Sequence, residues 1–365
     1  MLRIGIDCRL AGLSHAGIGR YISSFVPKVL SLLQDEAEVV LFCSTKEQAR
    51  DLCFAKSPRI EIVIAPYKHY SLAEQTVFLS VLNKQKLDLL HVPHFNVPYF
   101  YAGTFVVTIH DLLWHKQRGL QVTTLNPVVY WLKYFFYTHI VARAVSRAKK
   151  IFVPSQTIAT ELAATYPIAK EKTVVTYEGV GDSLLKVQLP TLARKTNTLL
   201  YVGSLYPHKN IAIVLQLLQQ HPELKLEVVT ARSAFVKRVK QQITALKVQN
   251  QVQFFLSIDD RALAKRYREA TALIQPSFSE GFGLTGLEAL MQNTPVLASD
   301  IPIFHEIYQA YATFFDPRNI TSLETAWNSV ATHKQEVTLP DNFSKRYNWD
   351  TLAKQTLDVY RNALT

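Results

Sequence analysis

Short apolar runs alternate with longer segments of helical periodicity along the first half of the chain. The runs have the length and composition of buried strands, and the segments between them, such as 19–33 and 71–82, have the length of helices. This alternation predicts a parallel sheet with helices on both faces. The predicted strands are Arg3–Asp7, Val39–Cys43, Ile60–Ile64, Asp88–Val92, Phe105–Ile109 and Lys150–Pro154.

The pattern breaks over residues 180–197, which are polar and lack a clear period, and then resumes. We therefore expect an α/β protein with two doubly wound domains, 1–180 and 181–345, followed by a last helix within 346–365. Two such domains facing each other would enclose one cleft. In the second domain we expect strands at Thr198–Gly203, Leu226–Thr230, Val252–Phe255, Ala272–Gln275 and Pro295–Ser299, and helices near Ile211–Gln220, Phe235–Leu246 and Arg261–Ala270.

Composition and charge narrow the class of ligand. The 365 residues are 48% hydrophobic and 19% charged, which suits two domains with cores of their own. The net charge of +11 suits phosphates, nucleic acid or an anionic membrane. No run of Lys and Arg interleaved with aromatics resembles a nucleic-acid module, so phosphorylated small molecules or anionic lipid are favoured.

The N-terminal residues and the cysteines indicate a cytoplasmic protein. The sequence "MLRIGIDCRL" enters a strand pattern directly, without the basic head and apolar stretch of a signal peptide. Cys8, Cys43 and Cys53 are odd in number and lack C-x-x-C spacing. We expect them to be buried thiols in a reducing compartment.

The segment "PSFSEGFGLTGLEAL", residues 276–290, follows a predicted strand and runs into a predicted helix. Backbone N–H groups at such a helix start, aided by the helix dipole, form an anion site. Gly281 and Gly283 have no side chain to keep a phosphate or sugar away from the amides around Phe282 and Leu284.

Two glutamates flank this glycine-rich segment. Glu280 stands in the loop and Glu288 about one turn inside the helix, so the two could lie about 10 Å apart, the reach of a nucleotide sugar. A carboxylate that accepts from ribose hydroxyls suits Glu288, which leaves Glu280 near the sugar. The alternative is a solvated loop residue and a helix residue beside an ordinary glycine turn.

The motif "GIGRY" follows the first predicted strand. With Gly17 and Gly19 it is expected to form a glycine turn running into a helix, in close backbone contact with a sugar or diphosphate. It is not a full G-x-G-x-x-G fingerprint, so no dinucleotide cofactor is expected. A plain tight turn is the alternative.

The motif "YVGSLYPHKN" supplies a candidate cation for a diphosphate. A strand ends at Gly203, Ser204 follows it, and Lys209 lies near the start of the next helix, where it can stabilise a departing nucleotide. A solvated lysine after a helix-capping turn is the alternative.

His110 and Asp111 follow the strand "FVVTI". A neutral imidazole at His110 could orient a sugar hydroxyl. Alternatively, the pair could simply cap a helix, with Asp111 accepting from the N–H groups that follow it.

Two further segments have simpler interpretations. Asp259 and Asp260 are interpreted as a helix cap, and no metal site is expected. Residues 126–150 are rich in aromatics and then in basic residues, and they lack the roughly 20 uninterrupted apolar positions of a membrane span. This helix could lie on an anionic membrane surface, or it could be a core helix with a solvated basic end.

The segment "SEGFGLTGLEAL" resembles the E-x7-E motif of retaining glycosyltransferases with the GT-B fold, the family 4 or group 1 enzymes. Further similar motifs occur in the expected order along nearly the whole chain: "GIGRY", "HVPHF", "TIHDLLW", "VPSQT", "YVGSLYPHKN", "VLASDIPIFHE" and "FFDP".

The resemblance implies two Rossmann-like domains facing a central cleft, with a nucleoside diphosphate sugar bound by the second domain and the acceptor by the first. Glu280 would then position sugar hydroxyls, His110 would contact the sugar, Glu288 would hold the ribose, and Lys209 the phosphates. The family transfers sugars with retention, usually without a metal, and its last helix crosses back to the first domain.

Ser204 departs from the family, which commonly has Arg at this position beside the lysine. Similarity of "VGSLYPHKN" to mannosyltransferases favours GDP-mannose as donor, and the acceptor would be a glycan or a lipid-linked glycan of bacterial surface polysaccharide, such as lipopolysaccharide. The alternatives are a disaccharide phosphorylase or sugar-phosphate synthase of the same fold, a two-domain nucleotide-sugar epimerase, or a non-catalytic partner subunit of a transferase.

Overall fold

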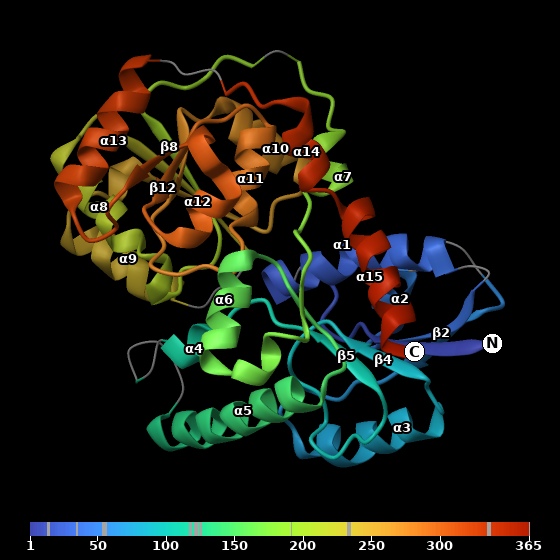
Figure 1. Cartoon of the computed structure of the whole chain (residues 1–365). Coiled ribbons are helices and arrows are strands. Elements are labelled where there is room, and N and C mark those ends of the chain that lie inside the picture. Colours follow the sequence, from blue (N-terminus) through green and yellow to red (C-terminus); the bar gives the residue numbers. More distant parts are fainter. Residues whose placement is uncertain are drawn as a thin grey trace. The chain divides into compact units, whose positions relative to one another are not determined.

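The computed structural model divides the chain into two compact units (Figure 1). Unit 1 contains Met1–Gly179 together with Tyr347–Thr365, and unit 2 contains Val180–Arg346. The structure describes all residues except 13–14, 34–35, 53–56, 117–118, 120–122, 124–125, 191, 232–234, 334–336 and 365.

Unit 1 is built on a seven-stranded sheet in which every pairing is parallel. The strand order is β3-β2-β1-β4-β5-β6-β7, so the direction in which strands are added reverses between β1 and β4. Buried apolar residues dominate the central strands, as a sheet covered on both faces requires. The strands are β1 (Leu2–Asp7), β2 (Ala37–Cys43), β3 (Ile60–Ile64), β4 (Leu89–Val92), β5 (Phe105–Thr108), β6 (Ile151–Val153) and β7 (Thr173–Val175).

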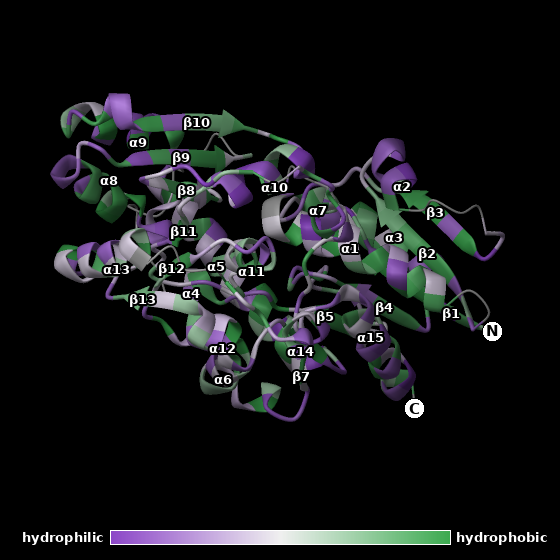
Figure 2. Cartoon of the chain, turned by 90° about the horizontal axis from the view of Figure 1, so that it is seen from above, coloured by the Kyte–Doolittle hydropathy of each residue, from purple (hydrophilic) through white to green (hydrophobic). Residues whose placement is uncertain are grey.

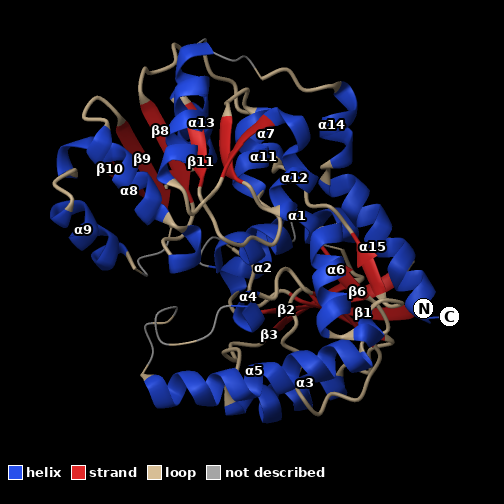
Figure 3. Cartoon of the chain, turned by 60° about the vertical axis from the view of Figure 1, so that its left-hand side comes forward, coloured by secondary structure: helices blue, strands red, loops and turns tan. Residues whose placement is uncertain are grey.

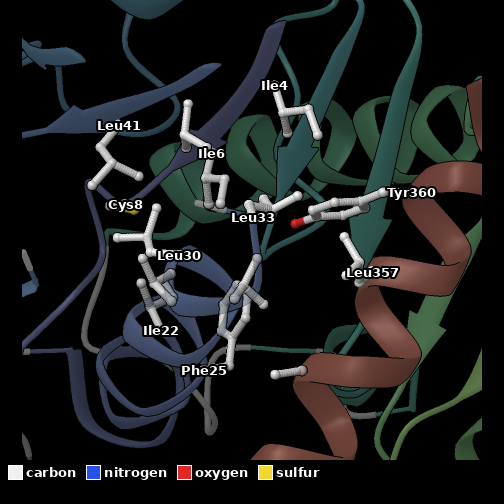
Figure 4. Packing of buried hydrophobic residues seen from close by; sticks show 14 of the residues in the cluster. Ile4, Ile6, Cys8, Ile22, Phe25, Leu30, Leu33, Leu41, Leu357 and Tyr360 are labelled. Carbon is white, nitrogen blue, oxygen red and sulfur yellow. The ribbon is translucent and has the colours of Figure 1, made fainter. Parts of the chain in front are cut away.

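Helices cover both faces of this sheet. One face packs against α1 (Ala16–Leu33), α2 (Lys46–Leu52) and α15 (Trp349–Leu364), as Figure 4 shows for side chains from β1, α1 and α15 that point toward one another. The other face packs against α5 (Pro127–Arg147), α6 (Gln156–Thr165) and a π-helical turn that leads into α3. The remaining elements are that turn, η2 (Glu74–Phe78), α3 (Leu79–Lys84), α4 (Leu113–Lys116) and η4 (Pro167–Ala169).

The helix α15 completes the core of unit 1 although it follows unit 2 in the chain. Its Tyr360 is buried, and the hydroxyl lies 2.6 Å from Nδ1 of His91 on β4. The other ring nitrogen of His91 lies 3.0 Å from Oγ1 of Thr108 on β5. Burial, with a smaller effect of His110, lowers the pKa of His91 to about 3, so the ring is neutral at physiological pH. His91, one of the histidines of "HVPHF", therefore holds the last helix to the sheet.

Unit 2 repeats the plan with a six-stranded parallel sheet in the order β10-β9-β8-β11-β12-β13. The strands carry long hydrophobic stretches, green in Figure 2, and helices lie on both sides of them in Figure 3. The strands are β8 (Thr198–Val202), β9 (Lys225–Thr230), β10 (Val252–Leu256), β11 (Ala272–Gln275), β12 (Val296–Ser299) and β13 (Ala312–Phe315).

The helices of unit 2 divide between the two faces of its sheet. Of these, α8, α9 and α13 contribute to a core cluster with β8, β9 and β11. The helical segments are α7 (Asp182–Leu185), η5 (Pro207–Lys209), α8 (Ile211–Gln220), α9 (Val236–Ala245), η6 (Gln249–Gln251), α10 (Asp260–Glu269), α11 (Leu284–Met291), α12 (Pro302–Tyr308), η7 (Gln309–Tyr311), α13 (Ile320–His333) and α14 (Asp341–Arg346).

The two doubly wound parallel sheets confirm the fold class expected from the sequence. Every strand predicted above is present, whereas β7 and β13 were missed. Of the cysteines, Cys8 and Cys43 are free and buried. Cys53 lies outside the described residues.

Replacing Tyr360 with Phe should destabilise unit 1. The change leaves Nδ1 of buried His91 without its partner, which costs about 1–3 kcal/mol. Urea unfolding followed by circular dichroism measures this effect. Arg361→Ala, on the same helix as Tyr360, removes an exposed ion pair with Glu36, which precedes β2; it is the matched control and should leave the midpoint nearly unchanged. Equal midpoints for Tyr360→Phe and the wild type would show that the hydrogen bond does not hold α15.

Candidate functional site

Two loops of unit 2 meet beside the point where the strand order of its sheet reverses. Strands β8 and β11 are neighbours in the sheet, and the connections that leave them diverge. In doubly wound sheets ligands bind at the carboxyl ends of such strands. The loop after β8 carries Gly203–Asn210 and the loop after β11 carries Pro276–Gly283. A backbone hydrogen bond of 2.8 Å from Phe278 to the carbonyl of His208 joins the two loops.

Lys209 and Glu280, both predicted site residues, form an ion pair between these loops. Nζ of Lys209 lies 2.5 Å from Oε1 of Glu280, and the side chains are only 21% and 13% exposed. Ser277 donates a second hydrogen bond of 2.8 Å to the same oxygen. The structure therefore brings together the cation and the carboxylate that the sequence assigned to different parts of a donor.

The pKa of Glu280 reflects these neighbours. Burial alone would raise the pKa, but the charge and hydrogen bond of Lys209, followed by His208 and Ser277, outweigh burial and hold it below its usual value. Glu280 is therefore a carboxylate at neutral pH.

The pair leaves hydrogen-bonding capacity for a ligand. An ammonium group has three donors, and within the described chain Lys209 uses one of them, on Glu280. Both donors that reach Glu280 bind Oε1, and no described residue donates to Oε2. Lys209 can thus bind an anion while Glu280 accepts from hydroxyl groups.

Hydrogen bonds with residues of β8 and β9 fix the backbone around Gly203 and Ser204. Gly203 has φ of +151°, a conformation that favours glycine, and its N–H donates to the carbonyl of Val229 on the neighbouring strand. The hydroxyl of Tyr201 donates to the carbonyl of Ser204 at 2.5 Å. The backbone of Ser204 is therefore fixed at the carboxyl end of β8. Its side chain is short and neutral, whereas the family commonly has Arg at this position.

Glu288 lies in the second turn of α11 and is 1% exposed. Its Oε2 accepts a hydrogen bond of 2.8 Å from Tyr267, a buried residue of α10. The two glutamates of the motif thus differ in setting, with Glu280 beside a lysine and Glu288 buried against a tyrosine.

The glycines of the motif serve packing as well as approach to the backbone. Gly283 has φ of +94°, and a Cβ there would lie 2.3 Å from the hydroxyl of Tyr308 on α12. Gly286 is inside α11, and a Cβ there would lie 2.3 Å from Oε1 of Gln275. The hydroxyl of Tyr308 donates to the carbonyl of Gly283 at 2.5 Å.

The explanation offered above for Gly283 is therefore corrected: protein atoms, not open space, lie on its Cβ side. The sequence analysis missed Tyr308, Gln275 and Gly286. One signal was available, because a glycine inside a helix costs stability and points to a close contact.

The expected glycine turn at "GIGRY" is also corrected. Helix α1 begins at Ala16, so Gly17 and Gly19 lie within its first turns, and the positive φ of +98° belongs to Gly12 before them. A Cβ at Gly19 would collide with the carbonyl of Gly12 at 1.9 Å. A Cβ at Gly17 would meet nothing within 4 Å, so of the two glycines in "GIGRY" it is Gly17 that faces open space.

His110 follows β5 in unit 1 and has protein groups at both ring nitrogens. Nε2 lies 3.1 Å from the carbonyl of Pro93, which can only accept, so Nε2 carries a proton. Nδ1 lies 3.4 Å from Oε1 of Glu178, and can donate to it only when protonated as well. The ring of Tyr21 packs edge-on against His110. Asp111 accepts from the N–H of Leu113, the capping contact considered as an alternative above.

A buried charge cluster that the sequence analysis missed lies at the carboxyl end of β1, where the strand order of unit 1 reverses. Arg9 donates to both oxygens of Asp7 and, at 2.8 Å, to Glu74 on η2. Burial would raise the pKa of Asp7, but Arg9 holds it below its usual value. The signal was the sequence "DCR", in which Asp7 ends a buried strand and Arg9 follows it, because buried charges need partners.

Other expectations concern metals and membranes. Asp259 caps α10 by accepting from Ala262, as expected. Among the described residues, no group of three or more His, Cys, Asp or Glu is placed to hold a metal ion. In the same residues, no helix has both the length and the apolar character needed to cross a bilayer.

Models of two families match the chain and together span most of it. Residues 188–348 match Glycosyl transferases group 1, and residues 18–183 match Glycosyltransferase Family 4. The chain belongs to the group 1 glycosyltransferases.

Curated relatives of this glycosyltransferase include enzymes that transfer mannose. The O-antigen chain mannosyltransferase RfbU of Salmonella typhimurium is 27% identical over 249 residues, which cover 67% of this chain and 69% of the relative. The serotype-specific mannosyltransferase WbdA of Escherichia coli is 30% identical over 169 residues, 44% of this chain and 20% of that protein.

Solved structures share the GT-B fold. A sucrose-phosphate synthase from Thermosynechococcus elongatus aligns over 99% of both chains with a TM-score of 0.74 and 19% identity. WaaG, a glycosyltransferase involved in lipopolysaccharide biosynthesis, aligns over 98% of this chain and 95% of its own with a TM-score of 0.68 and 16% identity.

Gly286→Ala should destabilise the glycosyltransferase although alanine favours helices. The added methyl group would meet Gln275 and the ring of Tyr308, and overpacking of this kind costs about 1–3 kcal/mol. Gly17→Ala is the matched control, since its methyl group meets open space and a helical alanine adds up to about 1 kcal/mol. Thermal and urea unfolding of both variants test this, and a stabilised Gly286→Ala would contradict the packing described.

Lys209→Met should make stability depend on pH between 7 and 5. Above its depressed pKa, Glu280 in the wild type stabilises the fold, and that contribution is lost only at more acidic pH. Without the cation, burial raises the pKa of Glu280, so the variant loses about 2–4 kcal/mol at pH 7 and regains part of it as protons bind.

Urea unfolding at both pH values measures this difference between the wild type and Lys209→Met. The double variant Lys209→Met/Glu280→Gln is the control, because it has no carboxyl group to titrate and should show a pH-independent difference. A difference for Lys209→Met that stays constant from pH 7 to 5 would rule out the coupling.

Proposed function

We propose that this glycosyltransferase transfers mannose from GDP-mannose to a glycan or lipid-linked glycan acceptor, with retention of configuration, in the synthesis of bacterial surface polysaccharide. The observation that carries the proposal is the Lys209–Glu280 pair at the carboxyl ends of β8 and β11. It places an ammonium with unused donors beside a carboxylate with an unused oxygen, which is what a diphosphate joined to a sugar needs.

On the donor side, Lys209 binds the diphosphate, together with backbone N–H groups of Gly281–Leu284 at the start of α11. Negative charge grows on the leaving phosphate as the glycosidic bond breaks, so Lys209 acts most strongly in the transition state. Ser204 adds a neutral donor where a charged one is common in the family.

The two glutamates divide the rest of the donor between them. Glu280 accepts from sugar hydroxyls through Oε2, while Oε1 stays on Lys209 and Ser277. Glu288 accepts from the ribose, with Tyr267 orienting its carboxylate. This division predicts that Glu288→Ala weakens binding of the free nucleotide, whereas Glu280→Ala mainly slows transfer.

Unit 1 binds the acceptor and also reaches the donor: His110 contacts the transferred sugar, and Gly17, in the first turn of α1, lets a sugar or diphosphate approach the backbone. Retention follows from attack on the face of the sugar that the phosphate leaves, with the leaving phosphate taking the acceptor's proton. Oriented reactants and preorganised charges lower the barrier, and no enzymic nucleophile is needed.

Mannose and a polysaccharide pathway are favoured by the relatives. RfbU and WbdA carry the name mannosyltransferase, and RfbU is described as acting on the O-antigen chain. The sequence supports a cytoplasmic enzyme whose lipid-linked acceptor lies at the inner face of the cell membrane.

The direct test is a panel of nucleotide sugars, scored by thermal stabilisation and by release of nucleoside diphosphate. GDP-mannose should stabilise the enzyme more than GDP-glucose, UDP-glucose or ADP-glucose, and only its turnover should rise with a mannan-type or lipid-linked acceptor. Transfer to inorganic phosphate or to a sugar phosphate would favour a phosphorylase or a sugar-phosphate synthase instead. Binding of every donor without turnover would favour a non-catalytic partner subunit.

Lys209→Ala should lower turnover ten- to a hundredfold, the value of a charge-assisted hydrogen bond of about 1.5–3 kcal/mol. Steady-state kinetics with saturating donor measures it. Because the same change leaves Glu280 unpaired, it is repeated in a Glu280→Gln background to separate two causes. Lys209→Ala/Glu280→Gln stays slower than Glu280→Gln if the missing charge acts on the diphosphate, and matches Glu280→Gln if Lys209 only neutralises Glu280.

A second background tests where that charge is needed. Ser204→Arg placed in Lys209→Ala should restore part of the rate, because Arg at this position commonly accompanies the lysine in the family. The control is Lys186→Ala, which removes an exposed lysine of the same unit and should change neither kcat nor the KM for the donor. A change below about twofold in Lys209→Ala would show that the phosphate binds elsewhere.

A further inference from the structure

Helix α5 presents bulky apolar side chains on both of its faces. The inner face is buried in the core of unit 1 through residues such as Tyr130, Tyr137 and Val141. The outer face lies at the margin of unit 1 in Figures 1 and 3. Six of its apolar side chains are 42–76% exposed: Val128, Val129, Trp131, Leu132, Phe135 and Phe136.

These six exposed apolar side chains form a larger contiguous patch than the scattered apolar residues of an ordinary protein surface. Among the described residues, 21 large hydrophobic side chains are exposed, and these six fall within nine consecutive positions. Half-exposed side chains of this size together present on the order of 500 Å², the scale of the largest apolar patches of soluble monomers, which commonly mark an interaction site. Their spacing of three and four residues places most of them on one side of the helix.

Basic residues continue the same surface. Residues 126–150 contain Lys133, Arg143, Arg147, Lys149 and Lys150, and no Asp or Glu. Arg143 and Arg147 follow Phe136 at helical spacing on the outer side. The guanidinium of Arg143 lies 4.6 Å from the ring of Tyr99, next to Phe100, whose side chain is 69% exposed.

The charge decides between possible occupants. A second copy of the chain in a symmetric contact would set these five cations against the same five, without an acid to offset them. A lipid bilayer with anionic headgroups supplies both an apolar layer for the aromatic half and phosphates for the basic half. Trp, Phe and Lys or Arg are also the residues that such interfaces favour.

We propose that the outer face of α5, extended by Phe100, docks on an anionic lipid bilayer, with the helix lying in the plane of the interface and Trp131, Phe135 and Phe136 entering the headgroup layer. The inference deepens the proposed function, since it names the surface by which the enzyme would reach a lipid-linked acceptor. Only the link to a lipid-linked acceptor rests on the proposed function, because membrane docking itself is a property of the surface of unit 1.

Vesicle sedimentation with the full chain tests the proposal. We expect strong binding to vesicles of phosphatidylcholine with 30% phosphatidylglycerol, and binding to phosphatidylcholine alone that is weaker by about tenfold or more. The variant Trp131→Ser/Phe135→Ser/Phe136→Ser should lose binding to both by more than about tenfold. Lys133→Gln/Lys149→Gln should lose mainly the preference for phosphatidylglycerol.

Matched controls come from elsewhere on the surface. Leu72→Ser removes a side chain that is 81% exposed in unit 1, and Lys237→Gln/Lys240→Gln removes two cations of α9; both should bind like the wild type. Donor hydrolysis without vesicles should be unchanged in the α5 variants, so a failure of docking is distinguishable from a failure of the proposed transferase activity.

The depth of insertion gives a second readout. Brominated lipid should quench tryptophan fluorescence of the bound wild type, and Trp131→Phe should bind while losing most of the quenching. The proposal is overturned if the wild type binds neither vesicle, if the triple variant binds as well as the wild type, or if Trp131→Phe keeps the quenching. A wild-type dimer that the triple variant converts to monomer would overturn it in favour of a second copy.

Discussion

The ion pair between Lys209 and Glu280 is the interaction on which the candidate site of unit 2 depends. A carboxylate that is almost buried needs a partner of opposite charge, and the only cation that pairs with Glu280 in the described chain comes from a loop 71 positions away. The pair therefore fixes the two loops at the carboxyl ends of β8 and β11 before any ligand arrives. In the proposed function, a bound diphosphate would share the lysine with the carboxylate, and this sharing would set the distance between the phosphate and the sugar.

Close packing supports the start of α11, the helix that follows Glu280 in the chain. Tyr308 and Gln275 fill the space on the Cβ side of Gly283 and Gly286, so the start of α11 packs closely against these side chains. A helix start supported in this way keeps its N–H groups and their partial positive charge oriented, and preorganised dipoles are what charge stabilisation requires. Gly283 and Gly286 are therefore positions where side chains of the fold pack directly against the backbone.

Much of the fold followed from the sequence because buried parallel strands are continuous apolar runs, which their short length and their alternation with helix-length segments reveal. The strands β7 and β13 were missed because three or four residues at a sheet edge carry too little pattern. At the candidate site, Lys209 and Glu280 were predicted from their positions after strands, yet their direct pairing is a long-range contact that no local pattern encodes. The packing reason for Gly283 was missed because Tyr308 lies 25 positions later. For α5 the sequence left a core helix and a surface helix open, and the structure shows one helix with a buried face and an exposed apolar face.

The contact between His91 and Tyr360 has a consequence for the order of assembly during synthesis. Unit 2 is one continuous stretch of chain, so its core can close as soon as residue 346 has left the ribosome. Unit 1 has most of its residues earlier, but the part of its core that α15 covers, beside α1 and β4, stays exposed until residues 349–364 follow, after the whole of unit 2. The domain translated first is thus the last to be completed. During that interval the apolar residues that α15 later covers are exposed to binding by a chaperone.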